Sequence, residues 1–186
     1  MSHMAYNFSP FKEETKKIAQ WLQNEFASIH TGKASPVILD SVNVESYGSF
    51  MPIKNIASIS IEDPKTLRVA PWDKNMIKEI EKAITASNLG LSLATDSDGV
   101  RVIFPMLTTE NREKLVKVVK AKLEDARISV RKAREEVQSD IEAKSKEGGF
   151  SEDDKFRAKD ELQKCVDTAN AELETLFEKK QSEILG

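Results

Sequence analysis

The stretch from Leu107 to about Ser145 constrains the fold most, because no Pro or Gly interrupts the chain between Thr108 and Gly148. It predicts one unbroken helix of roughly 37 residues, which at about 1.5 Å per residue is about 55 Å long. Apolar residues recur along it at alternating spacings of three and four, as in a helix that packs along a partner helix. They are Val116, Val119, Leu123, Ala126, Val130, Ala133 and Val137.

Beside this apolar seam the same helix carries a basic stripe, formed by Lys120, Arg127, Arg131 and Arg134. The three arginines fall at positions i, i+4 and i+7 and therefore share one helix face. Guanidinium groups in such a row can form forked hydrogen bonds with the phosphate oxygens of a nucleic acid. They can equally form surface ion pairs with a neighbouring helix, worth about 0–1 kcal/mol each. From the sequence of the helix alone, the two interpretations are equally well supported.

The charge distribution favours a partner that the protein's field can orient. Residues 112–134 contain 9 Lys/Arg against 3 Asp/Glu, whereas residues 135–186 contain 8 against 15, although the net charge is only −3. A composition of 39% hydrophobic and 32% charged residues argues against disorder. No apolar run approaches the roughly 18 residues of a membrane span, so we expect a soluble protein without a membrane partner.

Two further helices are predicted, one before and one after residues 34–104. Ser9-Pro10 is a helix start, and Ser151 with the acids that follow it is a capping signature. The first helix would end near His30 and the last near Leu185. Together, residues 5–30 and 106–186 predict an antiparallel three-helix bundle. Its other apolar positions are Phe11, Ile18, Leu22, Phe26, Ile29, Leu162, Val166, Ala169, Leu173 and Leu176.

Residues 34–104 read instead as a small inserted β/α/β domain, which makes the fold class α+β. Strands are predicted over 42–47, 56–61 and 66–70, followed by a helix that Asp73 caps. A last pair of strands, 91–93 and 100–104, flanks the turn at Asp96-Ser97-Asp98-Gly99. We interpret that turn as a plain turn rather than a calcium loop, because the later ligands are missing.

Two linkers, residues 30–33 and 104–106, connect the insertion to the bundle. The insertion joins the end of the first helix to the start of the second, so both linkers should lie at the same end of the bundle. Gly32 and Pro105 break regular structure there. We therefore predict a hinge at Thr31, Gly32, Phe104 and Pro105.

No catalytic or metal-binding motif is present, so we expect no enzyme activity, no cofactor and no metal site. Met1-Ser2-His3-Met4 looks like a cloning remnant, which leaves His30 without a second ligand or nucleophile at a recognisable spacing. The single Cys165 excludes an internal disulfide and fits a reducing compartment. It precedes Val166 of the apolar seam, which favours a packed thiol over a reactive one.

Six blocks of sequence resemble the ribosome recycling factor family, in the family's order and over essentially the whole of Ala5 to Gly186. They are Ile29-His30-Thr31-Gly32-Lys33-Ala34-Ser35-Pro36, Val44-Glu45-Ser46-Tyr47-Gly48-Ser49, Ala70-Pro71-Trp72-Asp73, Ala86-Ser87-Asn88-Leu89-Gly90-Leu91, Pro105-Met106-Leu107-Thr108 and Val130-Arg131-Lys132-Ala133-Arg134. The resemblance implies an L-shaped, two-domain protein. It also implies action after translation termination in the ribosomal A-site region, where elongation factor G with GTP turns the factor and the subunits separate.

The resemblance also implies that the basic stripe binds large-subunit rRNA, since Arg131 and Arg134 match the family's rRNA-contacting arginines. His30 and Lys33 stand where the family usually has Arg, and Glu135 stands where it usually has a further Arg. The strength of rRNA binding near the hinge and at the end of the stripe therefore stays open. The candidate rRNA-binding residues are His30, Lys33, Arg112, Lys120, Arg127, Arg131 and Arg134.

Two other interpretations remain. The protein could be a non-enzymatic coiled-coil adaptor, for which the helices and acidic tail would suffice. It could be an enzyme whose active site lies in the small domain, although no acid, base or nucleophile set supports this. We expect a monomer in the bacterial cytoplasm; an organellar protein stays open, because a transit peptide could have preceded the remnant.

Overall fold

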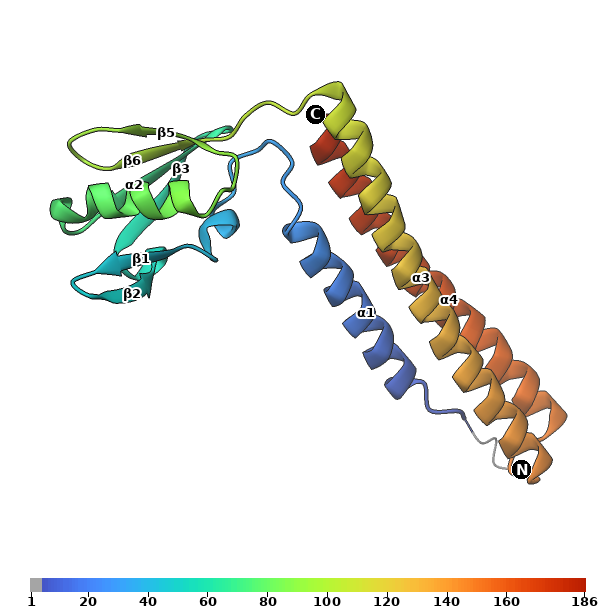
Figure 1. Cartoon of the computed structure of the whole chain (residues 1–186). Helices are drawn as coiled ribbons and strands as arrows, with labels where there is room; N and C mark the ends of the chain where they lie inside the picture. Colours follow the sequence, from blue (N-terminus) through green and yellow to red (C-terminus); the bar gives the residue numbers. More distant parts are fainter. Residues whose placement is uncertain (1–4) are drawn as a thin grey trace. The chain divides into compact units, whose positions relative to one another are not determined.

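The computed structural model describes residues 5–186, so the suggested cloning remnant lies outside the described residues. The chain forms two compact units (Figure 1). The first unit comprises the chain up to Phe26 together with Glu113–Gly186, and the second comprises Ala27–Arg112. Both predicted linkers, 30–33 and 104–106, fall within the second unit by this division. The predicted hinge stays a prediction.

Three long helices build the first unit: α1 (Ser9–Ala27), α3 (Thr109–Lys146) and α4 (Glu152–Leu185). The long central helix is confirmed at 38 residues. The predicted cap of α4 is also confirmed, because the Ser151 hydroxyl accepts a hydrogen bond from the backbone N–H of Asp154 in a capping box. α1 ends at Ala27, before the predicted end near His30.

Contacts between the helices fix their directions. The Lys122 Nζ of α3 lies 2.6 Å from the Glu25 carboxylate of α1, and the Tyr6 hydroxyl, ahead of α1, donates to Asp140 of α3 at 2.7 Å. Residue numbers thus rise on one helix as they fall on the other, which confirms that α1 and α3 are antiparallel. Arg127 with Glu174 and Glu142 with Lys159 are ion pairs that set the same antiparallel relation between α3 and α4.

The predicted apolar seam is the core of this bundle. On α3 the middle of the seam is buried and its two ends, Val116 and Val137, are half-buried. On α4, Phe177 is buried where the spacing pointed to Leu176, which is only half-buried, so that prediction was off by one position. The buried residues that the three helices share in this core include Leu22, Phe26, Val119, Leu123, Ala126, Val130, Leu162, Val166 and Leu173.

The second unit contains two antiparallel sheets. A two-stranded sheet pairs β1 (Asn43–Ser46) with β2 (Ser49–Pro52), and a four-stranded sheet has the order β3-β4-β6-β5. The strands of the larger sheet are β3 (Ala57–Asp63), β4 (Thr66–Pro71), β5 (Ser92–Thr95) and β6 (Val100–Ile103). Helix α2 (Ile77–Ala86) packs against both sheets, and its Ile80 and Ile84 lie in a core with Leu67, Val69 and Val102.

Strand β2 was missed, because the sequence predicted no strand between residues 47 and 56. Tyr47 and Gly48 both have positive φ, 49° and 87°, and connect Ser46 directly to its partner Ser49. Two such residues form the type I′ turn of a tight hairpin. The strand that follows, Ser49-Phe50-Met51-Pro52, shows no clear alternation of buried and exposed residues, so its pattern gives no strand signal.

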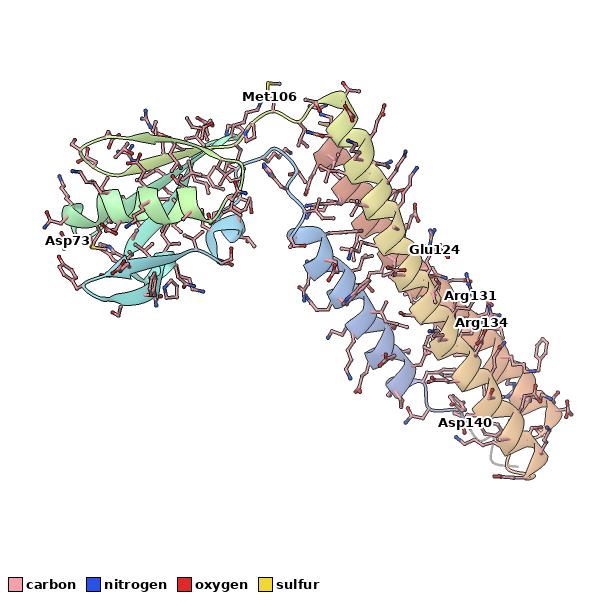
Figure 2. All side chains as sticks on the ribbon, in the orientation of Figure 1. Asp73, Met106, Glu124, Arg131, Arg134 and Asp140 are labelled. Atoms are coloured by element: carbon pink, nitrogen blue, oxygen red, sulfur yellow. The ribbon has the colours of Figure 1, made fainter. Side chains whose placement is uncertain are left out.

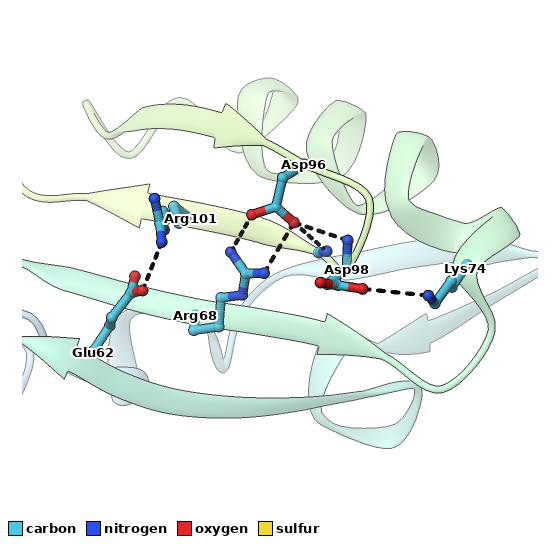
Figure 3. A network of polar contacts seen from close by, with 7 residues as sticks. Glu62, Arg68, Lys74, Asp96, Asp98 and Arg101 are labelled. Atoms are coloured by element: carbon cyan, nitrogen blue, oxygen red, sulfur yellow. Dashed lines mark hydrogen bonds and ion pairs between the residues drawn. The ribbon is translucent and has the colours of Figure 1, made fainter.

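A charged network covers the face of the large sheet opposite the core (Figure 3). Arg68 of β4 and Arg101 of β6 are direct cross-strand partners, an arrangement that would be unfavourable without neutralisation. Asp96 accepts two hydrogen bonds from Arg68, at 2.5 and 2.9 Å, and Glu62 pairs with Arg101 at 2.9 Å. The Asp96 carboxylate also accepts from two backbone N–H groups of its own turn. These bonds support the plain-turn interpretation.

We predict that the stability of the second unit depends on pH through Asp96. The hydrogen bonds from Arg68, followed by those from the turn backbone, lower the pKa of Asp96 to about 2. A lowered pKa in the folded state means that the contribution is complete above the ordinary pKa near 4 and is lost as pH falls toward 2. In Asp96→Asn this loss should be absent, so the gap in thermal midpoint between wild type and variant should shrink from pH 5 to pH 2. Circular dichroism would measure it.

Asp98→Asn is the matched control, because it removes only an exposed ion pair with Lys74 at 3.3 Å. Its gap from wild type should be small at every pH. If the difference in thermal midpoint between wild type and Asp96→Asn is the same at pH 2 and pH 5, the lowered pKa of Asp96 does not contribute to stability and the prediction is wrong.

Candidate nucleic-acid interface

The basic stripe lies on α3 beside the buried seam, as the sequence predicted. Arg131 and Arg134 are about one turn apart on this helix (Figure 2). Their neighbours Val130 and Ala133 are buried, whereas Arg131 is exposed and Arg134 is half-buried. Lys120 lies earlier on the same helix and is exposed. The seam thus anchors the helix while the cationic groups beside it stay accessible.

The four side chains of the stripe differ in what they contact. Arg127 forms an ion pair with Glu174 of α4. Among residues 5–186, Lys120, Arg131 and Arg134 form no hydrogen bond or ion pair through their side chains. The salt-bridge interpretation therefore holds for Arg127 alone. Three cations of the stripe remain available to an external anion.

A small cleft lies between α3 and α4 at this position. It has a volume of about 120 Å³ and is lined by Arg127, Val130, Arg131, Arg134, Val166 and Asn170. The Nε of Arg134 is buried here and has no hydrogen-bond partner. A buried donor without a partner is costly, on the order of 1–3 kcal/mol, unless a ligand or water satisfies it. Three arginines line the cleft, and the two without a carboxylate partner, Arg131 and Arg134, suit an anion with several oxygens, such as a phosphate.

The other predicted rRNA-binding residues, His30, Lys33 and Arg112, belong to the second unit. His30 packs edge-on against Phe104, with ring centroids 5.1 Å apart, and its Nδ1 accepts a hydrogen bond from the Gly32 N–H at 3.3 Å. Lys33 is exposed.

Two of the predicted hinge residues, Gly32 and Pro105, approach each other closely. Gly32 has φ +80°, and a Cβ at this position would lie 3.3 Å from the Leu107 side chain and 3.7 Å from the Pro105 carbonyl oxygen. This combination of left-handed backbone and close approach requires glycine. On the other strand of the connection, the Phe104 N–H donates to the Lys65 carbonyl at 2.8 Å. The chain segments into and out of the insertion therefore lie side by side.

Three observations bear on other classes of site. In the described part of the chain, His, Cys, Asp and Glu side chains do not gather in a group that could hold a metal ion. Burial raises the pKa of the Cys165 thiol, which disfavours the reactive thiolate. No helix within residues 5–186 combines the length and the apolar character needed to cross a bilayer.

Sequence reasoning missed two groups of residues. Asn170 and Glu174 line or neighbour the cleft from α4, and only the helix register places them opposite the stripe.

On the second unit, Tyr47, Phe50 and Trp72 are 82%, 73% and 71% exposed. The Tyr47 hydroxyl donates to Asp73 at 2.5 Å. Exposed aromatic residues of this kind are frequent at interaction surfaces.

The fold and the stripe define a class: a helical bundle with an inserted sheet unit and a row of unpaired cations on one helix. The family model for ribosome recycling factor matches residues 22–185. Ribosome-recycling factors from Symbiobacterium thermophilum and Thermotoga maritima are 40% and 41% identical to this chain over 174 residues, covering 94% of each chain. The chain belongs to the ribosome recycling factor family.

Solved structures agree with this assignment. One described as the solution structure of the ribosome recycling factor matches with a TM-score of 0.72 at 35% identity, covering 98% of this chain and 99% of that one. Another contains models of the T. thermophilus ribosome recycling factor and E. coli elongation factor G bound to the E. coli post-termination complex. It matches with a TM-score of 0.63 at 37% identity, covering 96% and 97%. The predicted fold class is thereby confirmed.

Proposed function

We propose that this protein is a non-enzymatic translation factor. It acts with elongation factor G and GTP on the post-termination ribosome, separates the subunits and releases them from mRNA for reuse. Family membership over nearly the whole chain supports this role, as does the similar factor that was placed with elongation factor G on a post-termination complex. We place the protein in the bacterial cytoplasm as a monomer, in keeping with its bacterial relatives.

The contact with the ribosome is made by the unpaired cations of α3. Arg131, Arg134 and Lys120 bind phosphate groups of large-subunit rRNA in the A-site region, and Arg112, Lys33 and His30 are weaker additional contacts. The observation that carries this proposal is that Arg131 and Arg134 have no carboxylate partner among the described residues, although the helix packed beside them is rich in acids. Phosphate contacts of this kind position a protein on folded RNA without reading its sequence.

The work of the protein is mechanical in this proposal. The buried seam makes α3 and α4 a stiff support, so force applied to the protein can be transmitted to the rRNA contacts. The connection at Thr31, Gly32, Phe104 and Pro105 serves as the hinge, because Gly32 alone tolerates its φ of +80°. The exposed aromatic residues of the second unit face a protein partner, for which elongation factor G is the candidate.

A coiled-coil adaptor without an RNA contact is the alternative. It would need the seam but would have no use for three unpaired cations in a row. The two proposals differ in how ribosome binding should respond to salt and to loss of a single stripe arginine.

We predict that Arg134→Ala weakens binding to purified large ribosomal subunits by about tenfold, because one charge-assisted phosphate contact is lost. Its free energy of unfolding should not fall more than about 0.5 kcal/mol below wild type, because the side chain has no partner in the protein and one of its buried donors is unsatisfied. Filter binding and thermal denaturation would measure the two quantities. Arg157→Ala is the control, since it removes the same charge from an exposed position of α4 away from the stripe. Lost stability with unchanged binding would favour the adaptor.

We also predict a definite salt dependence for binding to the large subunit. The three main phosphate contacts, from Lys120, Arg131 and Arg134, release counterions and set a minimum slope of log affinity against log salt of about −2 to −3. Affinity should then fall at least roughly 15- to 60-fold between 50 and 200 mM salt. A titration at fixed Mg²⁺ concentration would measure this slope. Absent binding, or an affinity that does not change with salt, would contradict the rRNA contact.

A further inference from the structure

The cleft beside the stripe has a second wall, which α4 supplies. Glu174 of α4 pairs with Arg127 of α3, and because the helices are antiparallel, the next turn of each brings Asn170 opposite Arg131. Both side chains line the cleft. On one turn of α4 the Glu174 carboxylate neutralises Arg127, whereas on the next turn the neutral amide of Asn170 lies opposite Arg131.

This difference between Glu174 and Asn170 determines which arginines of the stripe can bind an external phosphate. A carboxylate at position 170 would stand against Arg131 as Glu174 stands against Arg127. Of the two acids nearest to Asn170 on α4, Glu172 is exposed and forms no ion pair among the described residues, and Asp167 accepts a hydrogen bond from Gln163 on its own helix at 2.8 Å. The Asn170 amide itself forms no hydrogen bond within the described residues. It retains two N–H donors and one acceptor for a ligand.

The cleft matches one phosphate group in its chemistry. It is small, with a volume of about 120 Å³. Arg131 and Arg134 supply charge, and the Asn170 amide supplies two N–H donors. Val130 and Val166, both buried, complete the lining between the two helices.

We propose that Asn170 of α4 is an RNA-binding residue, which with Arg131 and Arg134 holds one backbone phosphate in this cleft, and that Glu174 limits the affinity by keeping Arg127 paired. The inference rests on the proposed rRNA contact and assigns α4 a part in it. The two residues of α4 thus act in opposite directions on the same ligand.

Two nearly isosteric substitutions test this. Asn170→Asp should weaken binding to purified large ribosomal subunits by about tenfold or more, and should make the salt slope shallower by about 1, because Arg131 gains an internal partner. Glu174→Gln should strengthen binding about three- to tenfold and make the slope steeper by about 1, because Arg127 becomes available. Asn170→Ala, which changes no charge, should weaken binding about threefold through loss of the amide donors.

Asn24→Asp is the matched control, because it makes the same substitution at an exposed position of α1 in the same unit. It should bind almost as wild type does, and thermal midpoints should show that all variants are folded. If Asn170→Asp binds the large subunit as tightly as Asn24→Asp does while Arg134→Ala binds it weakly, the proposed role of Asn170 is wrong, but the proposed rRNA contact of the arginines is supported. If Arg134→Ala also binds as wild type does, the proposed rRNA contact itself is wrong.

Discussion

The antiparallel packing of α3 against α4 is the interaction on which the rest of the structure depends. Small and β-branched residues such as Ala126, Val130 and Val166 are buried along it, so the two helices have one register in which these surfaces fit. That register decides which charged groups meet. It places Glu174 against Arg127 and leaves Arg131 facing an amide, so the accessible charge of the stripe is a consequence of how the core packs.

The second unit keeps its own core and needs none of the bundle's residues for it. Its apolar strand positions, such as Leu67 and Val102, lie against Ile80 of α2, and the opposite face of the sheet is held by ion pairs of Arg68 and Arg101. The insertion is joined to α1 and α3 by chain segments that touch at Gly32 and Pro105. A unit with a separate core and a narrow connection can be moved as a body, which the proposed role requires.

Periodicity predicted the elements whose pattern is long, and failed where the signal was local or depended on register. The 38-residue α3 and the cap at Ser151 were predictable from spacing and capping chemistry. Strand β2 was not, because four residues without alternation give no signal until the Tyr47-Gly48 turn is known to reverse the chain. The arginines of the stripe could be found from their spacing on α3. That Arg127 is paired and Arg131 is not depends on the position of α4, which the spacing on α3 cannot predict.

Subunit separation is the most direct test of the central claim, that unpaired arginines on α3 let this protein transmit force from elongation factor G to the ribosome. Post-termination complexes would be mixed with the protein, elongation factor G and GTP, and splitting would be followed by light scattering. We predict that the wild-type protein splits the complexes and that the Arg131→Ala/Arg134→Ala double variant, equally stable, does not at the same concentration. Failure of the wild type to split them, or equal rates for both proteins, would contradict the account.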